Sequence, residues 1–341
     1  MADCPLPDLQ RLALVGHGGN LAAARAAYPK APEPWLDLST GINPYSYPCG
    51  ELSLESATRL PEPQALRALE QAAARAYQVP AGMEVVAAPG TQAVINWLPY
   101  LLPVRRVGIL GFTYSEYARS WAVNGAEITT AADLAGLADA DVAIVVNPNN
   151  PDGRLVTAAD LHALAAAMSA HEGLLLVDEA FIDFLEPGAS VVPRMPAQGT
   201  IALRSFGKTY GLPGLRLGFA LAPKSLAERL RAALGPWPVS GAAIEFGTRA
   251  LLDKAWLATT RAKLEADAAA LEVILSAAGF TSIGGTPLFR LARHDDAPSC
   301  FELLASKGIL VRRFEERPTW LRFGIARHDA DRARLSAALR A

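Results

Sequence analysis

One lysine, Lys208, lies in the glycine-rich segment RSFGKTYGLPGLRLG at residues 204–218, directly after the apolar run TIAL. Glycine lets a backbone approach a ligand closely, and the side chains of Ser205 and Arg216 could both reach one phosphate group. A lysine beside a bound phosphate can form a Schiff base with the carbonyl cofactor that the phosphate anchors. The alternative is a glycine-rich surface loop that happens to carry a lysine.

Two other apolar runs end at polar side chains. Residues 173–177 lead into Asp178, and residues 143–146 lead into the turn NPNNPDG, which contains Asn150. Ligands bind at the carboxyl ends of strands in an open parallel sheet, so both residues are candidates for one site. A partly desolvated carboxylate needs a partner, and a protonated pyridine nitrogen would supply one. An N-cap or a structural salt bridge is the alternative for Asp178.

The order Asn150, Asp178, Lys208, Arg216, each in its local motif, resembles fold-type I pyridoxal-phosphate (PLP) enzymes of the aminotransferase class I/II superfamily over nearly the whole chain. This resemblance implies that Lys208 binds the PLP aldehyde, that Asp178 pairs with the ring nitrogen and that Asn150 donates to the ring oxygen. The other PLP-binding residues that it implies are Gly90, Thr91, Gln92, Ser205 and Arg216 around the phosphate, and Tyr114 over the ring. An ordinary helix cap at Thr91 and plain packing of Tyr114 are the alternatives.

Two turn-rich segments near the start, HGGN at 17–20 and DLSTGINP at 37–44, are candidate binding loops. They resemble the threonine-phosphate decarboxylase branch of the superfamily, which is closely related to the histidinol-phosphate aminotransferases. Phe181 agrees with that branch, since the aminotransferases usually have tyrosine three residues after the aspartate. For His17, a histidine that satisfies a turn is the alternative.

The resemblance implies decarboxylation of L-threonine O-3-phosphate to (R)-1-amino-2-propanol O-2-phosphate in cobalamin biosynthesis. In that reaction Arg322 would bind the α-carboxylate and Arg312 the distal phosphate, although arginines on strand faces are usually solvated. The substrate-binding residues implied are His17, Asn43, Asn150, Arg312 and Arg322. Transamination of histidinol phosphate is the first alternative, and a PLP-binding regulator without turnover is the second.

The elements that must position these residues alternate between strand and helix as far as about residue 221. This alternation predicts an α/β fold with a large, mostly parallel, doubly wound sheet. After residue 238, short strands mix with helices, including an Ala-rich helix over 253–278, which predicts a small α+β domain. We therefore expect an N-terminal segment (1–45) that packs with the small domain and the active site, a large PLP-binding domain (46–238) and a small domain (239–341).

Composition narrows the possible partners and compartment. Of the 341 residues 51% are hydrophobic, and the formal net charge is −2, which disfavours nucleic acid and anionic membranes as partners. No uninterrupted apolar run of about 18 residues and no basic start with an apolar core occur, so we expect a cytoplasmic protein. Cys4, Cys49 and Cys300 lie far apart, and the histidines lack metal-ligand spacing, which predicts free thiols and no metal. The family resemblance implies a homodimer in which residues 43–45 cross the interface.

Overall fold

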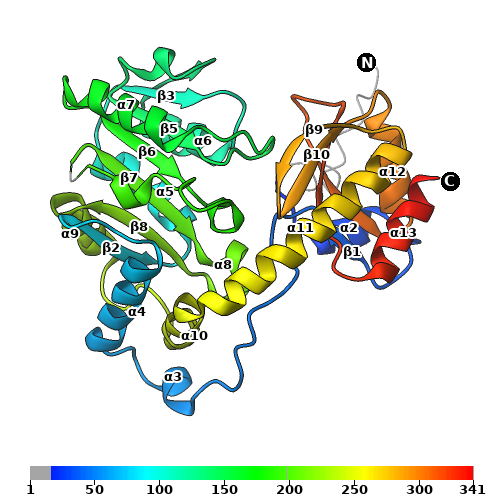
Figure 1. Ribbon diagram of the computed structural model, residues 1–341, viewed down its shortest axis with the longest axis horizontal. Coiled ribbons are helices and arrows are strands. Elements are labelled where there is room, and N and C mark those ends of the chain that lie inside the picture. Colours follow the sequence, from blue (N-terminus) through cyan, green and yellow to red (C-terminus); the bar gives the residue numbers. More distant parts are fainter. Residues whose placement is uncertain (1–16, 197, 341) are drawn as a thin grey trace, which may run out of the picture. The chain divides into compact units, whose positions relative to one another are not determined.

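The computed structural model describes residues 17–196 and 198–340, so Cys4 lies outside the described residues. The described chain divides into two compact units, residues 45–259 and residues 17–44 with 260–340. Each unit contains its own sheet (Figure 1). The division expected near residue 238 lies elsewhere in the structure, because helix α10 (Gly241–Leu252) packs on α4 (Pro63–Ala76) of the larger unit.

The larger unit is built on a sheet with the strand order β2-β8-β7-β6-β5-β3-β4. The strands from β7 to β4 are parallel to their neighbours, whereas β8 runs antiparallel to both β7 and β2. Strand bounds are β2 (Met83–Ala88), β3 (Arg106–Leu110), β4 (Glu127–Ala131), β5 (Val142–Val146), β6 (Leu174–Asp178), β7 (Thr200–Ser205) and β8 (Gly218–Pro223).

Alternate residues of the central strands belong to two apolar cores, one on each face of this sheet. In β5, Ala143 and Val145 lie in one core, while Val142, Ile144 and Val146 lie in the other. Helices α4, α7 and α10 cover the first face, and α5, α6 and α9 cover the second. Burial on both faces explains why these strands read as continuous apolar runs, and the predicted doubly wound α/β fold is confirmed.

The remaining helices of the larger unit connect these strands or precede the sheet. Their bounds are α3 (Leu54–Thr58), α5 (Thr91–Leu101), α6 (Glu116–Val123), α7 (Ala158–Ser169), α8 (Phe206–Thr209) and α9 (Lys224–Leu234), with 3-10 turns η1 (Ala135–Leu137), η2 (Ile182–Phe184), η3 (Val192–Arg194) and η4 (Pro213–Leu215). The short helix α8 follows β7 without a linker, which places the lysine motif at the carboxyl end of that strand.

The smaller unit has a sheet with the order β1-β11-β12-β10-β9, in which β1 is parallel to β11 and the other pairs are antiparallel. The N-terminal strand β1 thus joins strands from the end of the chain. The elements are α2 (Leu21–Ala27), β1 (Leu36–Leu38), α11 (Lys254–Ala277), β9 (Thr281–Thr286), β10 (Phe289–Arg293), α12 (Ala297–Ser306), β11 (Ile309–Arg313), β12 (Trp320–Gly324) and α13 (Asp329–Leu339). Helix α11 begins in the range of the larger unit and continues into that of the smaller one.

Candidate active site

Asp178 is the last residue of β6, and only 4% of its surface is exposed. Its carboxylate accepts a hydrogen bond from the Tyr117 hydroxyl at 2.8 Å and another from the backbone N–H of Ala180 at 3.0 Å. Burial raises the pKa of Asp178 above its ordinary value, while the positive charge of Lys208 and the Tyr117 hydrogen bond act in the opposite direction. The structure thus brings Asp178 within electrostatic reach of Lys208.

Lys208 lies in α8, and its side-chain nitrogen is 4.6 Å from the centre of the Phe181 ring. Phe181 is buried and lies three residues beyond Asp178. Strands β6 and β7 are parallel neighbours, with Asp178 opposite Leu203. The carboxyl ends of these two strands therefore deliver the acid, the aromatic ring and the amine to one place.

The amino end of α5 lies against Arg216. Gly90, which precedes the helix, has a φ of +82°, and a Cβ there would lie 2.7 Å from Nη2 of Arg216. A Cβ on Gly218 would lie 2.6 Å from the backbone nitrogen of Thr91. Among the described residues no side chain caps this helix. Its first N–H groups and the guanidinium therefore form a cup of hydrogen-bond donors suited to an anion.

Three further predicted residues lie beside this cup. Ser205, at the end of β7, pairs with Gly218 of β8. Gln92, in the first turn of α5, accepts a hydrogen bond from the Tyr114 hydroxyl at 2.9 Å. The Tyr114 ring stands edge-on to the Tyr117 ring, with 6.2 Å between their centres. Because Tyr117 bonds to Asp178, these contacts connect the cup to the buried acid.

Asn150 lies half-buried in the turn after β5, the strand next to β6. Two other asparagines hold this turn. Asn147 donates to the carbonyl of Val156 at 3.0 Å and accepts from its N–H at 2.8 Å. Asn149 donates to the carbonyl of Phe112 at 3.0 Å, which ties the turn to the loop that carries Tyr114. Sequence reasoning assigned a role to Asn150 and missed the scaffolding role of its two neighbours.

The residues assembled in the larger unit fit three parts of PLP: its phosphate, its ring nitrogen and its aldehyde. Because Gly90 and Gly218 have no side chains, the Arg216 guanidinium and the Thr91 N–H can come close to them, and Arg216 supplies positive charge for a phosphate. The Asp178 carboxylate is buried at a cost that a cationic ring nitrogen would offset. Lys208 supplies the amine that can bind an aldehyde.

Arg322 lies in the smaller unit, in the middle of β12, with 7% of its surface exposed. Its Nη2 donates to the carbonyl oxygen of Ser39 at 3.0 Å, and its guanidinium carbon lies 5.1 Å from the centre of the Phe289 ring. Burial and the charge of Arg312 lower the pKa of Arg322 to about 9. Arg312 is directly opposite Arg322 in the β11–β12 ladder, so two predicted anion-binding residues lie together.

The HGGN motif adjoins the same region of the smaller unit. A Cβ on Gly18 would lie 2.3 Å from the carbonyl oxygen of Ser39, and the N–H of Gly19 donates to the Ser39 hydroxyl at 2.7 Å. His17 is exposed, whereas Asn43 is buried with 1% of its surface accessible. The motif is therefore attached to the segment whose carbonyl accepts from Arg322.

Sequence reasoning missed a group of buried charges beside the predicted site. In the larger unit Arg204 forms ion pairs with Glu179 and with Asp183. Glu179 directly follows Asp178, and Arg204 lies four residues before Lys208. A signal was present, because Arg204 interrupts the apolar strand β7 and a charge there requires a partner. Tyr117 was missed as well, although it follows Tyr114 by one helical turn.

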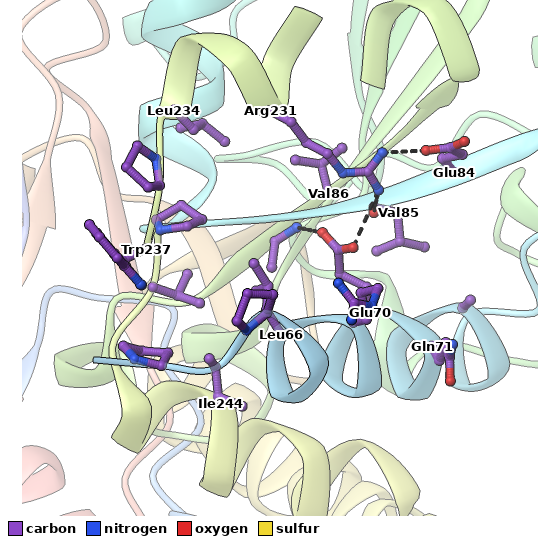
Figure 2. Close-up of a pocket in the computed structure, with 18 of the residues that line it drawn as sticks. Leu66, Glu70, Gln71, Glu84, Val85, Val86, Arg231, Leu234, Trp237 and Ile244 are labelled. Carbon is purple, nitrogen blue, oxygen red and sulfur yellow. Dashed lines mark hydrogen bonds and ion pairs between the residues drawn. The ribbon is translucent and has the colours of Figure 1, made fainter. Parts of the chain in front are cut away.

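A separate cavity of about 740 Å³ lies in the larger unit, between α4, β2 and the connection from α9 to α10. Its apolar walls include Leu66, Val85, Val86, Leu234, Trp237 and Ile244 (Figure 2). Arg231 reaches two carboxylates there, forming an ion pair with Glu84 and another with Glu70 at 3.3 Å (Figure 2). None of the predicted site residues lines this cavity, so it is distinct from the PLP site considered above.

Within residues 17–196 and 198–340, no group of three or more His, Cys, Asp or Glu side chains is arranged to hold a metal ion. No helix in that part of the chain combines the length and the apolar character that crossing a membrane demands. Cys49 and Cys300 are free thiols.

Comparisons with known proteins agree with the fold and with the motifs. A family model described as aminotransferase class I and II matches residues 33–338. The chain is 44% identical to a threonine-phosphate decarboxylase of Sinorhizobium sp over 95% of this chain and 97% of that protein. It is 39% identical to a threonine-phosphate decarboxylase of Pseudomonas aeruginosa over 96% of this chain and 97% of that protein.

Among solved structures, a histidinol-phosphate aminotransferase from Sinorhizobium meliloti in complex with pyridoxal-5'-phosphate has a TM-score of 0.82. It covers 99% of this chain and 97% of its own, at 20% sequence identity, so it supports the fold alone. The family model spans most of the chain, and the two relatives match it almost from end to end. The chain therefore belongs to the aminotransferase class I and II family.

Proposed function

We propose that this protein catalyses the PLP-dependent decarboxylation of L-threonine O-3-phosphate, which releases CO₂ and yields (R)-1-amino-2-propanol O-2-phosphate. The structural observation that carries the proposal is that the buried Asp178 carboxylate and the Lys208 amine, which lies 4.6 Å from the centre of the Phe181 ring, come from the ends of adjacent strands. The choice of reaction is supported by the two relatives that bear the name threonine-phosphate decarboxylase.

In this proposal Lys208 binds the cofactor, Asp178 pairs with the ring nitrogen and Asn150 donates to the ring oxygen. When bound, PLP supplies a ring that accepts the electron pair left on Cα as a substrate bond breaks. The residues that would hold its phosphate are Gly90, Thr91, Gln92, Ser205 and Arg216, and Tyr114 would stack on the ring. The close contacts of Gly90 with Arg216 and of Gly218 with the Thr91 nitrogen, which only glycine permits, support this cup.

Substrate selection is assigned to the arginine pair of the smaller unit. Arg322 would bind the α-carboxylate and Arg312 the distal phosphate, with further contacts from His17, Asn43 and Asn150. A guanidinium can hold a carboxylate through two parallel hydrogen bonds, which fixes its direction. Fixing the carboxylate decides which bond to Cα is aligned for cleavage. Once the substrate's amino group has displaced Lys208 from the cofactor, the freed amine would deliver a proton to Cα after CO₂ has left.

Transamination of histidinol phosphate is the second candidate, because the chain is also 30% identical to a histidinol-phosphate aminotransferase 2 of Rhizobium meliloti over 89% of its length. Phe181 weighs against it. A phenylalanine cannot donate the hydrogen bond that a tyrosine hydroxyl would supply beside the cofactor. The buried Phe181 ring instead presents its face to the Lys208 amine.

One experiment separates these candidates. The purified chain, loaded with PLP, is given L-threonine O-3-phosphate, and released CO₂ is measured. A parallel sample receives histidinol phosphate and 2-oxoglutarate, and glutamate is measured. CO₂ without glutamate supports the decarboxylase, and glutamate without CO₂ supports the aminotransferase. A chain that binds PLP and gives neither product would support the regulator alternative.

We further propose a cytoplasmic homodimer that serves cobalamin biosynthesis. Free thiols at Cys49 and Cys300 suit a reducing compartment. Trp97 and Tyr100 are exposed on α5 with 5.9 Å between their ring centres, and exposed aromatic pairs of this kind favour protein contacts. Sedimentation velocity tests the dimer directly, since a monomer at micromolar concentration would contradict it.

A further inference from the structure

Three buried charges lie next to the proposed cofactor site without belonging to it. The guanidinium of Arg204 donates from Nη1 to Glu179 at 2.8 Å and from Nη2 to Asp183. The side chain of Arg204 is 6% exposed, that of Glu179 is 0% exposed and that of Asp183 is 8% exposed. The guanidinium carbon also lies 4.2 Å from the centre of the buried Tyr77 ring. Burial alone would lower the pKa of Arg204, but the two carboxylates outweigh it and raise the pKa, so the cation persists.

The partners of Arg204 come from the two segments that carry Asp178 and Lys208. Glu179 directly follows Asp178, and its carboxylate is fixed further by the Ser190 hydroxyl at 2.6 Å and the Val191 N–H at 2.7 Å. Asp183 lies in η2, just beyond the same strand end. Thr209 directly follows Lys208 in α8, and its hydroxyl donates to Asp183. The Arg204 guanidinium therefore ties β7 to the segment that follows the buried acid, and the Thr209 hydroxyl ties helix α8, which carries the amine, to the same segment.

Stability alone does not account for this arrangement. A buried ion cluster is often no more stabilising than apolar side chains of the same volume, because removing charges from water costs free energy. Its two carboxylates also exceed its one cation. The forked geometry of a guanidinium, in contrast, fixes two acceptors at a set distance and angle, which a flexible ammonium cannot do.

We propose that Arg204 is a positioning residue, which holds the 178–183 segment and the 204–209 segment in the register that keeps the Lys208 amine over the Phe181 ring, near the end of the strand that carries Asp178. This inference rests on the proposed function in so far as Asp178 and Lys208 are taken to hold the cofactor. The positioning itself concerns the chain alone and can be tested without the cofactor.

The chain contains a matched control in the same unit. Arg231 also bridges two carboxylates, Glu70 and Glu84, but it joins α9 to α4 and β2 and lies apart from the predicted site residues. It is more exposed than Arg204, at 39% of its side chain. Substituting lysine in either place keeps the charge and removes the fork. Only the Arg204 substitution should affect Lys208.

The test measures the reactivity of Lys208 in the full chain freed of cofactor. The folded protein is acetylated with limiting acetic anhydride at fixed pH, and modification of Lys208 is quantified by peptide mass spectrometry relative to the exposed Lys224. We expect Arg204→Lys to raise the relative reactivity of Lys208 about tenfold, the effect of losing one charged hydrogen bond. Arg231→Lys should leave that ratio unchanged.

Thr209→Val provides a second variant in case Arg204→Lys does not fold. It removes only the hydroxyl that Asp183 accepts from, and we expect a smaller rise in Lys208 reactivity in the same direction. Circular dichroism establishes that each variant is folded. Unchanged Lys208 reactivity in folded Arg204→Lys or folded Thr209→Val would overturn the proposal.

This readout is independent of the reaction. If Lys208 reactivity rises but the native chain releases no CO₂ from threonine phosphate, the positioning role stands and the proposed function fails. If the native chain is a decarboxylase and Lys208 reactivity does not respond, the positioning role fails alone. In the PLP-loaded protein, the pH midpoint of the visible absorbance should move in Arg204→Lys and stay in place in Arg231→Lys.

Discussion

Gly90 and Arg216 lie so close that a Cβ on the glycine would come within 2.7 Å of the guanidinium nitrogen Nη2. The two residues are far apart in the sequence, and their contact places the amino end of α5 beside the loop between β7 and β8. The approach requires a residue without a side chain, and the φ of +82° at Gly90 makes the same demand.

Gly90→Ala should therefore displace Arg216 and weaken PLP binding about thirtyfold, as expected when a charged contact to phosphate is lost. The dissociation constant follows from absorbance titration of the cofactor-free protein. Gly125→Ala is the matched control, because Gly125 has the same φ of +82° and no atom within 4 Å of its Cβ position. Both variants should lose about 1 kcal/mol of unfolding free energy from backbone strain. Equal PLP affinity in the two variants would refute the phosphate role of Arg216.

Asp178→Asn should reduce CO₂ release at least about a thousandfold, since an amide cannot hold positive charge on the ring nitrogen.

The effect of Asp178→Asn on the free energy of unfolding should depend on pH. The pKa of Asp178 is raised in the folded protein, so the stability that this group contributes is present at low pH and is lost as the pH rises through that pKa. The cofactor-free Asn variant should thus gain stability relative to the native chain on going from acid to neutral pH. Thermal unfolding across that range is the measurement, and a difference independent of pH would contradict the burial argument.

Phe181→Tyr should lower CO₂ release about tenfold and introduce measurable amino transfer to 2-oxoglutarate, because it adds a hydrogen-bond donor beside the Lys208 amine. Phe181→Leu separates the hydroxyl from the loss of ring packing. It should slow CO₂ release without any amino transfer. Amino transfer in both variants, or in neither, would show that the hydroxyl does not direct the reaction.

Arg322→Lys should raise the KM for threonine phosphate about thirtyfold, since lysine cannot make two parallel hydrogen bonds to a carboxylate. Arg290→Lys is the control. Arg290 lies on the neighbouring strand β10 and is paired with Glu272 at 3.0 Å. A KM that rises no more in Arg322→Lys than in Arg290→Lys would argue against carboxylate binding at Arg322.

The central part of the fold was predictable from sequence because β5, β6 and β7 are buried on both faces. Such strands are continuous apolar runs, and each ends at a recognisable polar motif. β4 was missed, because its sequence EITTA is mostly exposed and resembles the turns around it. The reversed direction of β8 was not predicted either, since an apolar run carries no information about which way its neighbour points.

The residues of the candidate site likewise fall into two groups, those that sequence motifs predict and those that only the folded structure reveals. Asp178, Lys208 and Arg216 stand in local motifs that could be recognised one at a time. Tyr117 and Arg204 act through partners far away in the chain, at Asp178 and at Glu179 with Asp183. Only the folded arrangement of β6, β7 and α6 reveals those pairings. The division between the units, after residue 259, likewise depends on how α10 packs and not on a change in composition.

The pairing of Ser205 with Gly218 closes a loop, residues 206–217, that carries both Lys208 and Arg216. In the proposed function, covalent attachment and phosphate recognition thus depend on a single connection whose two ends are paired in the sheet. An inserted or deleted residue in this loop would shift Lys208 relative to Arg216. We expect this loop to tolerate changes of side chain far better than changes of length.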